Sequence, residues 1–312
     1  MRTAQAAGPR ETPEPTHRPR TRVFVAGAGL MGSGIAAQCA LAGYAVTLED
    51  VTPELAEAGQ RSLARALDGQ LRRGKLSPSD RQAALGRVEL TVGLSSASKA
   101  AIVVEAAPEK LEVKRAVFRE LEARTGPETM LASNTSSLPI TSIASSLKDP
   151  GRVVGIHFFN PVLQMALVEI VPGHETRAAV VAQADEFARS LGKTVVHSRD
   201  TPGFVTTRAL AVLLNEAAWM LHDGTATRDD IDAAYKLGFH HPMGPFELAD
   251  LVGLDTALSI LDVLWEGFHD AKYRACPLLR TLVESGKLGR KSGQGFYSYG
   301  KGAASPTGDP ST

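Results

Sequence analysis

Short apolar, β-branched runs alternate with longer stretches of helical periodicity along the first two thirds of the chain. The runs have the length of strands, and the stretches between them repeat apolar positions at helical spacing. The expected strands are 22–26, 45–49, 88–92, 101–105, 130–133, 153–157, 166–171 and 194–198, and the expected helices are 31–42, 53–73, 111–124 and 176–191. Strands that alternate with helices predict βαβ units and a mostly parallel sheet, an α/β fold.

The pattern changes after Asp200-Thr201-Pro202-Gly203. From there only helix patterns follow, at about 204–222, 227–237, 245–251, 255–269 and 277–285. The first of them is apolar on all sides (ALAVLLNEAAWML), which is typical of a helix buried on most sides. In so small a domain, such a helix often packs against a second subunit, so we expect a homodimer through this part. The chain is expected to divide into an α/β domain (21–199) and an all-helical domain (200–300).

Length and composition narrow the class of protein. The chain has 312 residues, enough for two domains that each bury a core. Its formal net charge is zero, so no overall field attracts nucleic acid or an anionic membrane, and no apolar run approaches the roughly 18 residues of a membrane span. Cys39 and Cys276 make neither a disulfide framework nor a recognisable zinc site, so no metal is expected.

The two ends of the chain have the composition of disordered tails. Residues 1–20 are dense in Pro, Thr and Arg, and residues 301–312 in Gly, Ser and Pro, so neither can bury apolar surface. The prolines, with Glu11 and Glu14, argue against an organelle presequence at the N-terminus. A cytoplasmic location is therefore expected.

A glycine-rich turn joins the first expected strand to the first expected helix. The strand RVFVA runs directly into Gly27-Ala28-Gly29-Leu30-Met31-Gly32. Gly27 permits a tight turn, Gly29 lets the backbone approach a pyrophosphate, and Gly32 allows close packing of helix on strand. A pyrophosphate would lie at the helix N-terminus beside Leu30 and Met31, where free N–H groups and the helix dipole favour an anion.

The acidic residue after the second strand indicates which nucleotide binds. Asp50 follows the turn by about 20 positions and can accept both hydroxyls of an NAD ribose, whereas it would repel the 2′-phosphate of NADP. Strand alternation points the neighbouring Glu49 to the other face. A glycine turn without ligand and a flavin site share this fingerprint. The strand before it, the helix after it and the acidic residue together favour NAD.

An NAD-linked alcohol dehydrogenase needs a base that works near neutral pH, a task that suits histidine. Among eight histidines, His157 ends the expected strand RVVGIH, and ligand crevices of α/β sheets lie at the carboxyl ends of strands. A structural histidine is the alternative. Glu169 ends the run ALVE, and a carboxylate among apolar residues needs a partner, which we expect to be His157. The alternative for Glu169 is a solvated strand end.

A polar run, 133–137 (SNTSS), follows the expected strand at 130–133. Such a run is usually a helix cap and turn. At the carboxyl end of a strand it can equally present hydroxyls and an amide to a substrate.

A series of segments over residues 21–299 follows the order and spacing of one enzyme family. The segments are GAGLMGSGIA from Gly27, EKLEVKRAVF from Glu109, SNTSSLPI from Ser133, GIHFFNPVLQMALVEIVP from Gly155, DTPGFV from Asp200, HPMGPFELADLVGLDT from His241 and GRKSGQGFY from Gly289. On these segments the chain resembles the L-3-hydroxyacyl-CoA dehydrogenases, in particular the bacterial 3-hydroxybutyryl-CoA type. HFFNP with LVEI, and the HPMGP segment, are the most specific.

The resemblance implies a Rossmann-type, doubly wound domain followed by a helical one, and reversible oxidation of a short-chain (S)-3-hydroxyacyl-CoA with NAD. It implies His157 as the base, Glu169 as its orienting carboxylate and Ser136 as a hydrogen-bond partner of the 3-oxygen. Further residues that it places along the nicotinamide half of NAD or near the cofactor are Glu109, Lys114, Asn134, Asn160 and Lys291.

A basic cluster in the second expected helix is a candidate for the CoA phosphates. Arg72, Arg73 and Lys75 lie in the 53–77 segment, which the resemblance positions toward CoA. Such a cluster is more often a solvated helix face.

Thr207 departs from the family pattern. Family members commonly read PGFxxNR with an active-site asparagine, whereas this chain reads PGFVTTR, with Thr207 in place of the amide. A threonine hydroxyl still donates one hydrogen bond to a substrate carbonyl, but it is shorter and has fewer donors. We expect retained activity with altered substrate placement or rate.

Two other functions stay open at this point. A dehydrogenase of a free hydroxy acid, of the sugar-acid or carnitine type, would keep the fold, but HFFNPVLQM followed by ALVEIV fits the acyl-CoA branch better. A non-catalytic NAD-binding protein has only Thr207 in its favour. The preferred acyl chain and the pathway, with β-oxidation of fatty acids among the candidates, do not follow from the sequence.

Overall fold

Eight apolar runs form one sheet in the computed structural model, which describes residues 21–300. The strands are β1 (Arg22–Ala26), β2 (Ala45–Asp50), β3 (Val88–Val92), β4 (Ile102–Glu105), β5 (Met130–Ser133), β6 (Val153–Phe158), β7 (Leu167–Pro172) and β8 (Thr194–His197). Their order across the sheet is β3-β2-β1-β4-β5-β6-β7-β8. The tails expected to be disordered, 1–20 and 301–312, lie outside the described residues.

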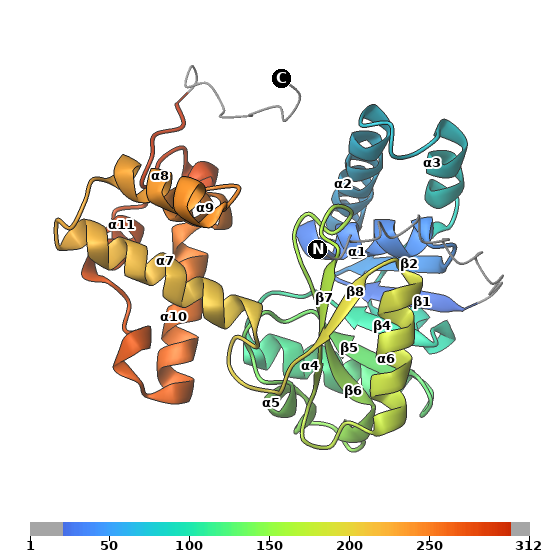
Figure 1. Cartoon of the computed structure of the whole chain (residues 1–312). Helices are drawn as coiled ribbons and strands as arrows, with labels where there is room; N and C mark the ends of the chain where they lie inside the picture. The colour runs from blue at the N-terminus through green and yellow to red at the C-terminus, as the bar shows by residue number, and fades with distance from the viewer. Residues whose placement is uncertain (1–20, 301–312) are drawn as a thin grey trace, which may run out of the picture.

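Helices cover both faces of this sheet (Figure 1). They are α1 (Leu30–Leu41), α2 (Pro53–Arg72), α3 (Pro78–Leu85), α4 (Leu111–Arg124), α5 (Ile140–Ala144) and α6 (Ala178–Ser190), with short 3₁₀ turns at Leu94–Lys99 and Pro150–Arg152. Because strand side chains alternate, Val25 belongs to the core under α1, α2 and α6, whereas Phe24 belongs to the core under α4 and α5. The doubly wound α/β prediction is confirmed.

The direction of β7 is the feature that the sequence analysis did not predict. β6 pairs antiparallel with β7, and β8 then pairs parallel with β7, so the last two strands run against the other six. The segment 159–166 between them is too short for the crossover that a parallel pair needs. Glu169, expected at the end of its strand, is therefore the third residue of β7, near the carboxyl end of β6.

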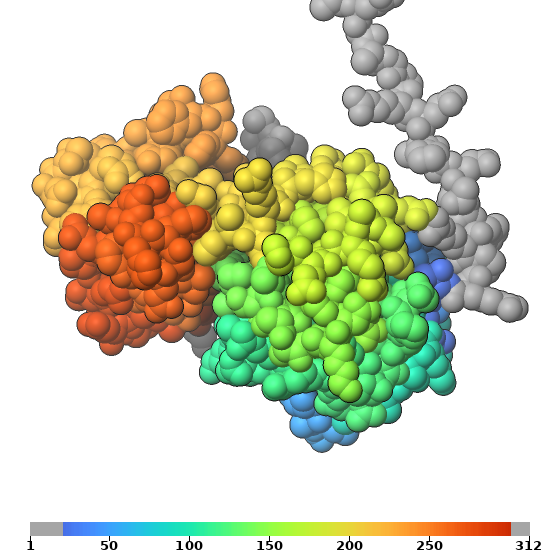
Figure 2. Space-filling view, turned by 90° about the horizontal axis from the view of Figure 1, so that it is seen from below, coloured from blue at the N-terminus to red at the C-terminus, as the bar shows by residue number. Residues whose placement is uncertain are grey.

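Helices are the main elements of the described chain after β8, beside two isolated β-bridges at Gly289–Gln294 and Gln294–Ser298. The helices are α7 (Thr206–His222), α8 (Arg228–Phe239), α9 (Pro245–Val252), α10 (Leu254–Phe268) and α11 (Pro277–Glu284), with 3₁₀ turns at Ala271–Tyr273 and Arg290–Ser292. Figure 2 shows this helical region, in orange and red, packed beside the sheet region. No helix in residues 21–300 combines the length and apolar character of a membrane span.

Helix α7 is less enclosed within one chain than its apolar composition predicts. Ala211, Leu214 and Ala218 are buried against the rest of the helical region, but Leu213 and Met220 are only partly buried. The buried residues of α7 thus belong to two clusters of the helical region, and most of its other apolar positions are half-buried against them.

A buried carboxylate fastens the C-terminal segment to α9. Asp250 accepts hydrogen bonds from the backbone N–H of Phe296 (2.9 Å) and Tyr297 (2.8 Å) and from the Tyr299 hydroxyl (3.0 Å). A Cβ on Gly295 would lie 2.0 Å from Asp250 Oδ1, so only glycine fits there. This packing gives Gly295 a structural role in fastening the segment to α9.

Glu49 of β2 is a buried carboxylate that makes stability depend on pH. Burial, and then the neighbouring charge of Asp50, raise the pKa of Glu49 from 4.5 to about 7. Because this folded-state pKa lies above the unfolded value, ionisation of Glu49 destabilises the folded protein progressively as the pH rises from 4.5 to about 7.

Replacing Glu49 by glutamine should therefore raise Tm more at about pH 8 than at about pH 5.5, where the carboxyl is largely protonated in the folded state. Thermal unfolding at the two pH values measures this difference. Glu128→Gln, at an exposed glutamate, is the control and should change Tm little at either pH. An equal gain for Glu49→Gln at both pH values would contradict the raised pKa.

Candidate active site

The antiparallel pairing of β6 and β7 places an imidazole beside a carboxylate. His157 and Glu169 are directly opposite in the strand register, and His157 Nδ1 lies 2.7 Å from Glu169 Oε2. Both side chains are buried, with exposed fractions of 5% and 0%. With Nδ1–H donating to the carboxylate, the lone pair of Nε2 is left free to take or return a proton.

Glu169 is also held by the start of α7. Its Oε1 accepts hydrogen bonds from the backbone N–H of Val205 (3.2 Å) and Thr206 (2.9 Å), and its Oε2 accepts one from the Thr206 hydroxyl (3.0 Å). Burial alone would raise the pKa of Glu169, but the hydrogen bonds from His157 and Thr206 outweigh it and hold that pKa below its usual value. The carboxylate therefore stays charged beside the imidazole at neutral pH.

The glycine turn after β1 fits the backbone of a dinucleotide. A Cβ on Gly32 would lie 1.8 Å from the Gly27 carbonyl oxygen, so this glycine is needed for α1 to pack against the turn. Gly27 has a φ of +100°, which favours glycine. At Gly29 no atom lies within 4 Å of an added Cβ, so the space beside it is open for a ligand.

Asp50 lies at this turn, as the sequence analysis expects. Its Oδ2 accepts a hydrogen bond from the backbone N–H of Ala28 at 2.8 Å, which fixes the carboxylate beside the glycines. Leu30 and Val51 expose 67% and 74% of their surface nearby, which offers apolar contact to a nucleoside. The described residues thus fit an NAD ribose and pyrophosphate.

A cavity of about 260 Å³ lies between the carboxyl ends of β4 and β5 and helix α10 of the helical region. It is lined by Met31, Ala106, Ala107, Glu109, Lys114, Asn134, Ser136 and Ser137, and by Thr256, Ser259 and Ile260 of α10. Five residues singled out in the sequence analysis meet here. The α10 side chains were missed, although the segment HPMGPFELADLVGLDT, which ends at Thr256 in α10, pointed to this part of the chain. Asn134 Oδ1 also accepts a hydrogen bond from the Phe158 N–H (2.9 Å), next to His157.

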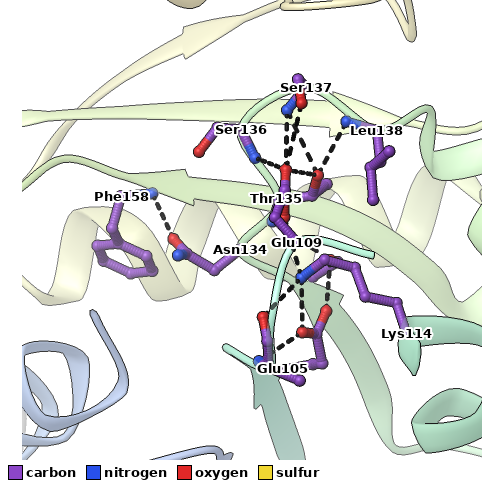
Figure 3. Close-up of polar contacts among 11 residues, drawn as sticks. Glu105, Glu109, Lys114, Asn134, Thr135, Ser136, Ser137, Leu138 and Phe158 are labelled. Atoms are coloured by element: carbon purple, nitrogen blue, oxygen red, sulfur yellow. Dashed lines mark hydrogen bonds and ion pairs between the residues drawn. The ribbon is translucent and has the colours of Figure 1, made fainter. Parts of the chain in front are cut away.

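Glu109 organises the polar run that follows β5 (Figure 3). Its Oε1 accepts hydrogen bonds from the Thr135 hydroxyl (2.6 Å) and from the backbone N–H of Ser136 (2.9 Å) and Ser137 (3.2 Å). Burial alone would raise the pKa of Glu109, but the charge of Lys114 and these hydrogen bonds outweigh it and lower the pKa. The run is therefore a turn held by a charged carboxylate, and Ser136 lines the cavity as well.

Lys114 is 1% exposed and lies between two carboxylates (Figure 3). Its Nζ is 2.7 Å from Glu105 Oε1 and 3.2 Å from Glu109 Oε2, and Glu105 Oε2 accepts a hydrogen bond from the Ser133 hydroxyl at 2.6 Å. Glu105 was not among the site residues expected from the sequence. A charged residue at the end of the apolar strand IVVE was the signal that pointed to it.

A second cavity, of about 250 Å³, lies between α1, α2 and the loop after β6. Of the basic residues expected to meet CoA, Arg73 lines this cavity, together with Arg65, whereas Arg72 and Lys75 do not. Asn160, expected along the nicotinamide, also lines this second cavity rather than the first.

Lys193 and Lys291 are anchored in different ways. Lys193 Nζ donates to the carbonyl oxygens of Val162 (2.5 Å) and Met165 (2.8 Å) and so holds the loop that borders the second cavity. Lys291 forms an ion pair with Asp255 at 2.5 Å, one residue before the cavity-lining Thr256.

Thr207 lies in the first turn of α7 and is 8% exposed.

Residues 21–300 contain no cluster of three or more His, Cys, Asp or Glu side chains arranged to hold a metal ion.

Family models match the chain over both of its parts. The NAD-binding domain of 3-hydroxyacyl-CoA dehydrogenase matches residues 22–201, and the C-terminal domain of the same family matches residues 203–299. The chain belongs to the 3-hydroxyacyl-CoA dehydrogenase family. The family and NAD as its cofactor, both expected from the sequence, are confirmed.

Individual relatives agree with this assignment. A probable 3-hydroxybutyryl-CoA dehydrogenase of Bacillus subtilis is 46% identical over 278 residues, which cover 89% of this dehydrogenase and 97% of the relative. The solved structure of FadB2 from M. tuberculosis matches with a TM-score of 0.88 at 44% identity. The match covers 90% of this chain and 99% of the FadB2 chain. The structure of (S)-3-hydroxybutyryl-CoA dehydrogenase PaaH1 from Ralstonia eutropha has a TM-score of 0.86 at 39% identity, with coverage of 90% and 99%.

Alanine substitutions at two glycines of the turn should affect different properties of this dehydrogenase, one its stability and the other its affinity for the cofactor. Gly32→Ala should destabilise the protein by about 3 kcal/mol, because the new Cβ collides with backbone. Gly29→Ala should leave the free energy of unfolding nearly unchanged but weaken NADH binding about tenfold, because the methyl occupies the ligand's space. Urea unfolding and NADH fluorescence titration measure the two effects. Unaltered NADH affinity in Gly29→Ala would show that the cofactor does not approach this backbone.

Proposed function

We propose that this dehydrogenase reversibly oxidises the 3-hydroxyl of a short-chain (S)-3-hydroxyacyl-CoA, such as 3-hydroxybutyryl-CoA, to the 3-ketoacyl-CoA. The observation that carries the proposal is the buried pair of His157 and Glu169, 2.7 Å apart. The pair lies at the carboxyl ends of the parallel strands, the same edge of the sheet at which the glycine turn follows β1. The names of the Bacillus subtilis and Ralstonia eutropha relatives support the choice of substrate.

The proposed mechanism assigns a separate task to each side chain. NAD, when bound, supplies the acceptor for the hydride. His157 takes the hydroxyl proton at Nε2, and the charged Glu169 stabilises the imidazolium that forms. Burial excludes water and so strengthens this attraction. Ser136, held on the turn that Glu109 organises, donates its hydroxyl to the 3-oxygen. In the reverse direction His157 returns the proton.

The second cavity is where we propose that CoA binds. Arg65 and Arg73 supply two cations for phosphate groups, and Asn160 borders the cavity three residues beyond His157. A thioester held along this cavity leads from α2 toward the base. Binding energy from the remote nucleotide would then help to position the 3-carbon.

A dimer formed through the helical region is part of the proposal. In support, Leu237 and Phe239 at the end of α8 expose 80% and 64% of their surface, and Leu213 and Met220 of α7 are only partly covered. The division of the chain into domains at residues 199 and 200, the cytoplasmic location and a role in β-oxidation stay predictions.

NADH oxidation with acetoacetyl-CoA, run beside free acetoacetate, tests the proposed function. We expect turnover of the thioester and little turnover of the free acid, because only the thioester carries the phosphates for Arg65 and Arg73. His157→Ala should lower kcat about 10³-fold through loss of the general acid and base. His174→Ala, at an exposed histidine, is the matched control and should behave as the wild type.

Equal turnover of thioester and free acid would instead indicate a hydroxy-acid dehydrogenase. Tight NADH binding without turnover of either compound would indicate a non-catalytic NAD-binding protein.

Thr207 should limit the rate with this substrate. An asparagine reaches further and has two donors, so Thr207→Asn should raise kcat/KM for acetoacetyl-CoA about threefold, the value of part of one hydrogen bond. Thr207→Val should lower it by a similar factor. Steady-state kinetics on both variants give the answer. If both match the wild type, this position does not contact the substrate.

A further inference from the structure

One carboxylate oxygen beside the base has two hydrogen-bond donors. Glu169 Oε2 accepts from His157 Nδ1 at 2.7 Å and also from the Thr206 hydroxyl at 3.0 Å. The other oxygen, Oε1, is held by the backbone N–H of Val205 and Thr206. The backbone contacts need no particular side chain at position 206, whereas the contact to Oε2 needs a hydroxyl there.

We propose that Thr206 is a positioning residue of the dehydrogenation, whose hydroxyl fixes the plane of the Glu169 carboxylate and weakens its attraction for the His157 imidazolium. This inference rests on the proposed function, in which His157 is the base. Thr206 itself does not touch the reacting atoms in this scheme and acts only through Glu169.

The negative charge of Glu169 Oε2 is shared between its two hydrogen-bond donors. A second donor on Oε2 withdraws charge that would otherwise stabilise a protonated His157. The effect is large only where water does not screen it, and Glu169 is 0% exposed. Thr206 therefore weakens the electrostatic stabilisation that the Glu169 carboxylate gives to a protonated His157.

The linker before α7 is shaped to bring Thr206 to this position. Gly203 and Phe204 both adopt left-handed backbone conformations, with φ of +73° and +50°. For Phe204 this conformation is strained, and burial of its ring at 3% exposure offsets the strain. The two residues turn the chain so that the N-terminus of α7 faces the Glu169 carboxylate.

The other ionisable groups near the pair are engaged elsewhere. On β8, His197 binds Asp185 of α6 at 3.1 Å, and on α7, Arg208 binds the Tyr273 hydroxyl at 2.7 Å. In the linker, Asp200 accepts hydrogen bonds from the start of α5, and the side chain of Arg199 is exposed. Within the described residues, His157 is thus the ionisable partner of Glu169, and a change at Thr206 should be reported by His157 alone.

The test is the pH dependence of kcat/KM for oxidation of (S)-3-hydroxybutyryl-CoA by the wild type and by Thr206→Val. Valine keeps the shape of the side chain and removes the hydroxyl. The rate rises with pH as His157 becomes neutral, and we expect the midpoint of this rise to move upward by about 0.5 unit, a threefold change in proton affinity. Thr206→Ser keeps the hydroxyl and should restore the wild-type midpoint. Thr225→Val, at an exposed threonine beyond the other end of α7, should not move it.

A second measurement separates this inference from the proposed function. NMR titration of the ¹⁵N-labelled His157 ring in the NAD-bound protein needs no substrate, and it should show the same upward shift in Thr206→Val. Thr206→Ala serves if the valine variant does not fold. An inactive wild type with a shifted ring titration would overturn the proposed function and keep the contact. Superimposable titrations of wild type and variant would overturn the inference.

Discussion

The Glu169 carboxylate is the interaction on which the site depends, because its two oxygens serve two parts of the chain. One oxygen accepts a hydrogen bond from Nδ1–H of His157. The other accepts hydrogen bonds from backbone N–H groups at the start of α7. A buried charge without partners would be costly, so both sets of donors are needed for the carboxylate to stay ionised. The Glu169 carboxylate therefore positions both the catalytic base His157, on the sheet, and α7, the first helix of the helical region.

Most elements were predictable because their hydrophobic periodicity is strong. The strand at Val88–Val92 and the helix at Leu111–Arg124 match the predicted ranges fully, since apolar β-branched runs and amphipathic stretches carry their own boundaries. The direction of β7 was not predicted, because side-chain alternation is the same in parallel and antiparallel strands. Only the shortness of the 159–166 segment carried that information. Helix α3, Pro78–Leu85, was missed because it buries a single alanine and has little periodicity.

The candidate site was predictable in its residue types but less so in its grouping. Gly27, Asp50 and His157 lie where motif and strand position place them, and Glu169 faces His157 as expected but from the third position of β7. Asn160 was expected along the nicotinamide but lines the cavity between α1 and α2, because the loop after β6 folds back toward α2. The buried partners of the motif residues lie outside any contiguous motif. The charged end of the strand IVVE marks Glu105 in the sequence, but its pairing with Lys114 and Ser133 follows only from the packing of β4, β5 and α4.

The left-handed pair Gly203 and Phe204 has a consequence for recombination between relatives. A chimera joined at the start of α7 keeps the linker with Glu169 but takes Thr206, whose hydroxyl contacts that carboxylate, from the other parent. A junction placed before Asp200 moves the linker together with its helix but leaves Glu169 on the other parent. The functional unit for exchange is therefore β6, β7, the linker and the first turn of α7 as one block, which does not coincide with the visible border between sheet and helices.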